Sequence, residues 1–132
     1  MTSGHILLAT GGVLGIIMVV LSTMVTRQRY RLRVSLGDGG GAPAHEPLRV
    51  AMRAQANFAE YVPLILLLLG GLTLAGAGSR LILGLSVVLV IARISHPIGM
   101  YRPAPNPLRA GGIILTWCVL LVASFAAILY AL

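Results

Sequence analysis

The chain has 132 residues, of which 58% are hydrophobic and only 10% charged, and its mean hydropathy is +0.95. About a quarter of the residues of an ordinary soluble domain are charged, so the composition excludes such a domain and predicts an integral membrane protein. The net charge of +7 comes from ten arginines against three acids, and their placement decides whether it indicates a nucleic-acid partner.

Four stretches are long enough to cross about 30 Å of hydrocarbon as helices. They predict an all-α transmembrane bundle in a single domain, with spans at about 6–28, 47–77, 80–101 and 107–131 and a loop at about 34–46. The third span is the weakest, because only twelve residues, 81–92, precede Arg93. The first is not expected to be a cleaved signal peptide, because no basic residue precedes it and its apolar run is too long.

The first span is uncharged over residues 6–26, and its Gly11 and Gly15 have a spacing that lets helices approach closely. Four arginines then alternate with other residues over 27–33, so they should point in several directions around a continuing helix. The following segment, SLGDGGGAPAHEP, has three consecutive glycines and is expected to be a loop. A phosphate-binding loop is disfavoured, because no strand precedes it and no Gly-Lys-Ser/Thr follows.

A row of polar side chains runs into the second span. At 100° per residue, one line on this helix contains Glu46, Arg49, Arg53, Asn57, Glu60 and Leu64. We call this line the polar stripe. An ionisable group at the bilayer centre costs roughly 2.5–3.5 kcal/mol, so the stripe is expected to face a partner helix or a water-filled cavity.

Only a few residues join the second and third spans, which predicts an antiparallel hairpin. The third span has a second polar face. Pro97 should kink or end this helix near its cytoplasmic end. The face consists of Ser86, Arg93, His96 and Met100, with Tyr101 at its edge.

The segment RPAPNPLRAGG, residues 102–112, has prolines at alternate positions and should be extended and stiff. It places Arg109 in the first turn of the fourth span. A cation there interacts unfavourably with the helix dipole, at a cost of roughly a few tenths of a kcal/mol. This placement suggests that Arg109 serves something other than helix stability. The single cysteine, Cys118, excludes an internal disulfide and offers no metal-binding pattern.

Nine of the ten arginines border the first or third connection, and only Arg80 borders the second. By the positive-inside rule, both connections should be cytoplasmic and both termini outside. Membrane topology therefore explains most of the positive charge, and we expect no nucleic-acid partner.

Polar groups from three spans converge in depth near the cytoplasmic boundary. They are Arg53, Asn57, Glu60, Arg93, His96 and Arg109. One interpretation is a structural network that holds the bundle together. The other is a site for a small zwitterion with more negative than positive charge.

Glutathione has this chemistry. It carries two carboxylates for arginine, one ammonium for Glu60, amides for Asn57, and a thiol. The pKa of a free thiol is about 8.5, and an adjacent arginine lowers it. The residues themselves predict a polar ligand at a helix interface without naming it.

The segment RAQANFAEYVP resembles the signature of the MAPEG family, the membrane-associated proteins of eicosanoid and glutathione metabolism. RAQ, Asn57, the Glu60–Tyr61 pair and Pro63 stand as in its leukotriene-forming branch. A second segment, ARISHPIGMYRPAPNPLRA, is similar to the prostaglandin-E synthase branch. The resemblance covers the whole chain and includes a GDGG loop, as in bacterial members.

The resemblance implies a homotrimer in which glutathione binds between neighbouring subunits near the cytoplasmic face. Arg109 matches the arginine that stabilises the thiolate. Arg29 matches a first-helix arginine, although the alternating run leaves its register open. The family's tyrosine one turn after the histidine is Met100 here, with Tyr101 beside it as a candidate replacement. The remaining matches to glutathione-binding positions are Arg53, Asn57, Glu60, Tyr61 and His96.

We therefore predict a glutathione transferase of the bacterial inner membrane that detoxifies hydrophobic electrophiles from the bilayer, with peroxidase activity as an extension. A non-catalytic lipid-binding or scaffold protein of the same family is the main alternative. A four-span cation exporter is disfavoured, because such a transporter needs an acid in the first span and this span has none.

Overall fold

The computed structural model describes residues 1–40 and 42–132, so the third glycine of the expected loop, residue 41, lies outside the described residues. Its helices are α1 (Ser3–Leu32), α2 (Glu46–Leu74), α3 (Ser79–Met100) and α4 (Pro107–Ala131), and a short 3₁₀ turn, η1 (Pro43–His45), precedes α2. All four α-helices are long and apolar enough to cross a membrane. The prediction of an all-α, four-helix membrane protein is confirmed.

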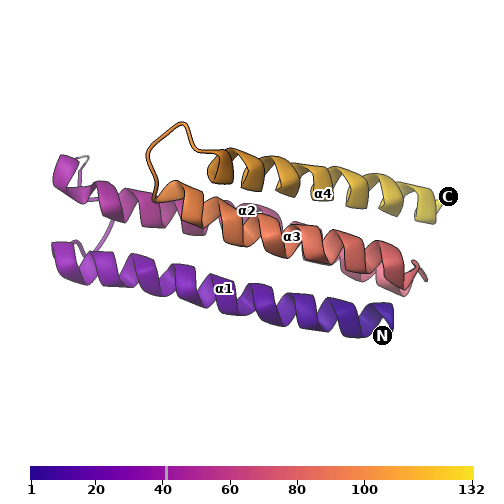
Figure 1. The fold of residues 1–132 in the computed structure, drawn as a ribbon. Helices are drawn as coiled ribbons and strands as arrows, with labels where there is room; N and C mark the ends of the chain where they lie inside the picture. Colours follow the sequence, from indigo (N-terminus) through magenta and orange to yellow (C-terminus); the bar gives the residue numbers. More distant parts are fainter. Residues whose placement is uncertain (41) are drawn as a thin grey trace.

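α1 and α4 run along opposite sides of the bundle, with α2 and α3 between them (Figure 1). α3 packs most extensively on α4 and then on α1, while α2 packs mainly on α1 and α4. Both chain termini lie at one end, and the α1–α2 and α3–α4 connections lie at the other (Figure 1). We call the second end the arginine-rich end, since nine of the ten arginines lie on or near it.

The helix ends follow from local chemistry. α1 begins after Thr2, whose side chain accepts a hydrogen bond from the His5 amide, and it ends where Arg33 adopts a left-handed φ of 55°. The second span was expected to end at about residue 77. α2 ends earlier, at Leu74, because Gly76 turns the chain with a φ of 84°.

α3 continues through Pro97 to Met100, in line with the expected span 80–101, so of the two expected effects of this proline, a kink or an end of the helix, the second does not occur. A proline inside a helix costs about 3 kcal/mol through its missing N–H and its clash with the preceding turn. Tertiary packing offsets this cost, because the side chain of His96 and the backbone of Gly99 are buried on either side of the proline.

The apolar core draws one face from each helix. On α2, buried residues recur every three or four positions, which is the pattern of a helix with one face inward. They are Leu48, Ala51, Ala54, Phe58, Val62, Ile65, Leu69 and Leu72. The polar stripe occupies other positions of the same helix, so the core of the protomer does not cover it.

α3 and α4 approach each other most closely through two glycines near the arginine-rich end. A Cβ on Gly99 would overlap the backbone of Arg109, and one on Gly112 would lie 2.7 Å from the backbone nitrogen and Cβ of His96. At Gly11 and Gly15 a Cβ would meet nothing within 4 Å, so this protomer does not use that pair for close packing.

We predict that Gly112→Ala separates α3 from α4. Overpacking typically costs about 1–3 kcal/mol, which should lower the thermal unfolding midpoint of the detergent-solubilised protein by several degrees. Gly111→Ala is the matched control, because a Cβ there would meet nothing within 4 Å. Equal midpoints for the two variants would contradict the close contact at Gly112.

Candidate functional site

The polar stripe lies on the surface of the protomer. Arg53 and Glu60 are exposed, and Asn57 between them is half-buried. Glu60 lies fourteen residues before the end of α2 at Leu74, or about 21 Å along a helix that crosses about 30 Å of hydrocarbon. Its carboxylate would therefore meet lipid in a lone protomer, at a cost of roughly 2.5–3.5 kcal/mol, so this face requires a ligand or another chain against it.

Arg93 points inward from α3 and is only 1% exposed. Its Nη1 donates a hydrogen bond of 3.0 Å to Asn57 Oδ1, and its Nη2 donates one of 3.4 Å to the carbonyl oxygen of Gly112. Thr116 Oγ1 donates to the same carbonyl at 2.7 Å. Arg93 thus connects α2, α3 and α4 at the level of the polar stripe.

His96 and Arg109 meet across the α3–α4 contact. His96 is 5% exposed and lies against Gly112, three residues after Arg109. Gly99, three residues after His96, lies against the Arg109 backbone. The two predicted residues are therefore about one helical turn apart along this interface, with His96 buried and Arg109 exposed.

Asn106 fixes the start of α4. Its Oδ1 accepts hydrogen bonds from the backbone N–H groups of Leu108 at 3.0 Å and Arg109 at 3.4 Å. This N-cap satisfies two amides that have no partner within the helix, so it holds the backbone that carries the Arg109 side chain.

The two candidate tyrosines occupy different environments. Tyr61 is half-buried beside Glu60 and packs against the apolar core. Tyr101 follows the last residue of α3 and is 42% exposed. It lines a hollow of about 600 Å³ at the arginine-rich end, together with Glu46, Val50 and Arg102.

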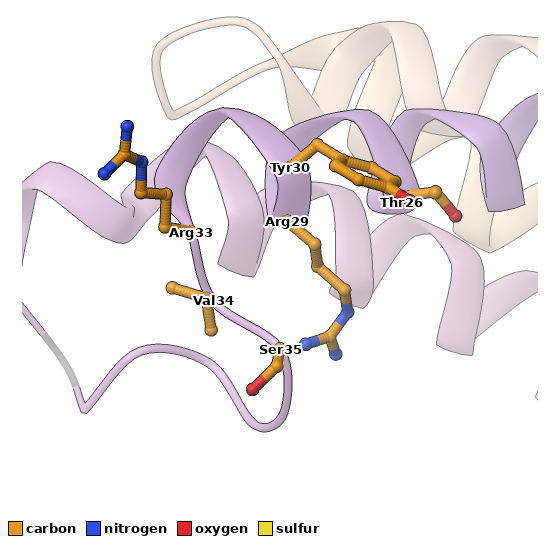
Figure 2. A pocket seen from close by; sticks show the side chains of 6 residues that line it. All are labelled: Thr26, Arg29, Tyr30, Arg33, Val34 and Ser35. Carbon is orange, nitrogen blue, oxygen red and sulfur yellow. The ribbon is translucent and has the colours of Figure 1, made fainter.

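Arg29 lines a separate hollow of about 460 Å³ at the end of α1, with Thr26, Tyr30, Arg33, Val34 and Ser35. Figure 2 shows the Arg29 side chain extending toward the segment that carries Ser35, whereas Arg33 points away from it. Arg29 Nη2 contacts Met52 Sδ at 3.8 Å, and its Nη1 is buried with no hydrogen-bond partner among the described residues. The hydrogen-bond partner of Arg29 on α2 is thus Met52, which is not part of the polar stripe.

The structure thus brings together some of the predicted residues. Asn57 is held by Arg93, and His96 lies beside the α4 turn that carries Arg109. Arg93 was expected at this level, but its bond to Asn57 was not predicted. The close contacts at Gly99 and Gly112 were not predicted either, although each glycine stands three residues after a candidate site residue.

Comparison with known proteins decides the family. The model of the MAPEG family matches residues 7–129, nearly the whole chain. The chain belongs to the MAPEG family. The resemblance inferred from the two motifs is confirmed.

This MAPEG protein is 30% identical over 115 residues to the inner membrane protein YecN of Escherichia coli K12, covering 87% of this chain and 84% of YecN. YecN of the E. coli O6:H1 strain CFT073 matches to the same extent. No solved structure matches the chain. The chain is thus a homologue of a bacterial inner membrane protein, and it has four candidate membrane spans of its own. Both findings agree with the expected location in the inner membrane.

We predict that Asn106→Ala loosens the first turn of α4, because loss of an N-cap costs about 0.5–2 kcal/mol. Hydrogen–deuterium exchange should become faster in the segment 108–111, while Asn106→Asp, which keeps a capping oxygen, should exchange as the natural protein does. Unchanged exchange in Asn106→Ala would show that the cap does not hold this turn.

Proposed function

We propose that this chain is a membrane-bound glutathione transferase that conjugates the glutathione thiolate to hydrophobic electrophiles from the bilayer. The observation that carries the proposal is the row formed on a membrane-spanning helix by the exposed Arg53 and Glu60 and the half-buried Asn57. Side chains of this kind within a membrane are costly and mark ligand or ion sites. Membership of the MAPEG family supports glutathione as the ligand.

The residues present fit the tripeptide. Arg53 and Arg109 are exposed cations suited to its two carboxylates and its thiolate, and Glu60 is an exposed acid suited to its ammonium group. Asn57 supplies amide hydrogen bonds. We also assign Tyr61, His96 and Tyr101 to the site, with His96 acting from the buried side of the α3–α4 contact.

The site is proposed to lie between subunits of a homotrimer. In this arrangement the face of α2 that carries Glu60 is covered by a neighbouring copy, which removes the cost of exposing a carboxylate to lipid. The neighbour would contribute Arg29, the match to the family's first-helix arginine, which lines a hollow at the end of α1. The arginine-rich end is proposed to face the cytoplasm, as the positive-inside rule predicts.

Arg109 is the proposed catalytic residue. Glutathione supplies the nucleophilic sulfur, and a guanidinium beside the thiol lowers its pKa below about 8.5, which increases the thiolate fraction at neutral pH. In the conjugation, a carbon–sulfur bond forms and the bond to the leaving group breaks. As a second activity, two such thiols would reduce a hydroperoxide to an alcohol and water and form a disulfide.

A non-catalytic, lipid-binding scaffold of the same family is the competing function. A scaffold has no need of the charged set formed by Arg53, Glu60 and Arg109. Calorimetric titration of the detergent-solubilised protein separates the two functions, since a scaffold should release no heat of glutathione binding.

We predict that Arg109→Ala slows conjugation of a chlorinated nitrobenzene at pH 7 by up to about thirtyfold, because a thiol with a pKa of about 8.5 is only about 3% thiolate at this pH. Without the guanidinium the pKa returns toward about 8.5, so the deficit should shrink as the pH is raised past that value.

Arg80→Ala is the control for Arg109→Ala, because Arg80 is an exposed arginine at the start of α3, on the connection opposite the arginine-rich end. It should keep the natural rate and pH profile. Equal turnover by the natural protein and Arg109→Ala at every pH would remove Arg109 from the mechanism.

A further inference from the structure

Arg93 is charged, but it is too deeply buried to bind a ligand itself. It is 1% exposed, and its two terminal nitrogens are already bonded to Asn57 Oδ1 and to the carbonyl of Gly112. Its Nε is buried without a hydrogen-bond partner among the described residues. A guanidinium kept inside a membrane bundle at this cost is expected to have a role beyond packing.

The chemistry of the two side chains fixes how the Asn57 amide is turned. A guanidinium has five N–H donors and no acceptor, so only the oxygen end of an amide can face it. The Arg93–Asn57 bond therefore commits Oδ1 to Arg93. The other end of the amide, Nδ2, can only donate.

The position of Asn57 puts this donor on the polar stripe. Asn57 is half-buried and lies four residues after Arg53 and three before Glu60, which places all three on one face of α2. If the amide turned over, its oxygen would face the site, where it would repel the carboxylates and carbonyl oxygens of a peptide-like ligand.

We propose that Arg93 is a positioning residue that holds the Asn57 amide with its N–H groups directed to the carbonyl or carboxylate oxygens of glutathione. The inference rests on the proposed function. The same guanidinium donates a second hydrogen bond to the carbonyl of Gly112 on α4. This bond fixes the position of the Asn57 amide relative to α4, the helix that carries Arg109.

A double-mutant cycle read by glutathione calorimetry tests this role. Arg93→Met keeps an unbranched apolar stem and removes the donors. It should weaken glutathione binding by about tenfold, the value of one well-placed hydrogen bond. In an Asn57→Ala background the same change should weaken binding by less than about twofold, because no amide remains to be oriented. Arg93→Lys, which retains one donor for Oδ1, should recover part of the affinity.

Asn57→Asp keeps the test decisive if Arg93→Met fails to fold. The aspartate preserves the acceptor for Arg93 but has no N–H group. It should therefore keep the thermal unfolding midpoint of the natural protein and lose glutathione affinity as Asn57→Ala does.

Two results would overturn the positioning role. One is an equal loss of affinity on Arg93→Met with and without the Asn57 amide, which is the behaviour of a purely structural link between helices. The other is full glutathione affinity in Asn57→Asp. If the natural protein itself bound no glutathione, the proposed function would fail and this inference with it, so the two failures are distinguishable.

Discussion

A charge placed in hydrocarbon has to be hydrated, paired or covered, and this constraint organises the chain. Most of the arginines meet it simply by lying at the ends of the helices, near the membrane surface. Glu60 and Arg93 do not, because both lie well inside membrane-spanning helices. The side chains of these two residues point in opposite directions, one into the bundle and one out of it.

Arg93 is turned inward and satisfied by polar groups of the neighbouring helices, the Asn57 amide and the Gly112 carbonyl. Glu60 is turned outward on the surface of α2. Asn57 accepts a hydrogen bond from Arg93 and lies half-buried on the same face of α2 as Glu60. An inward charge that fixes an amide, next to an outward charge that needs cover, is an arrangement suited to binding a zwitterion between subunits.

The sequence predicted the helices well because hydropathy and length determine them, and no tertiary detail is required. The polar stripe was predicted because the spacing of Arg53, Asn57 and Glu60 follows from helix geometry alone. The inward turn of Arg93 could not be predicted, since it depends on which helix packs beside it. The expected third span, 80–101, already extended past Pro97, and α3 does continue past this proline because packing of His96 and Gly99 against α4 outweighs its local cost.

In the proposed protein, the exposed face of α2 forms one wall of a glutathione site that a second copy completes. The most direct test is a cryo-electron microscopy map of the protein in lipid nanodiscs with glutathione added. We expect tripeptide density against Arg53, Asn57 and Glu60, closed on its other side by α1 of a neighbouring copy. A map in which Glu60 faces lipid, with no tripeptide along α2, would contradict it.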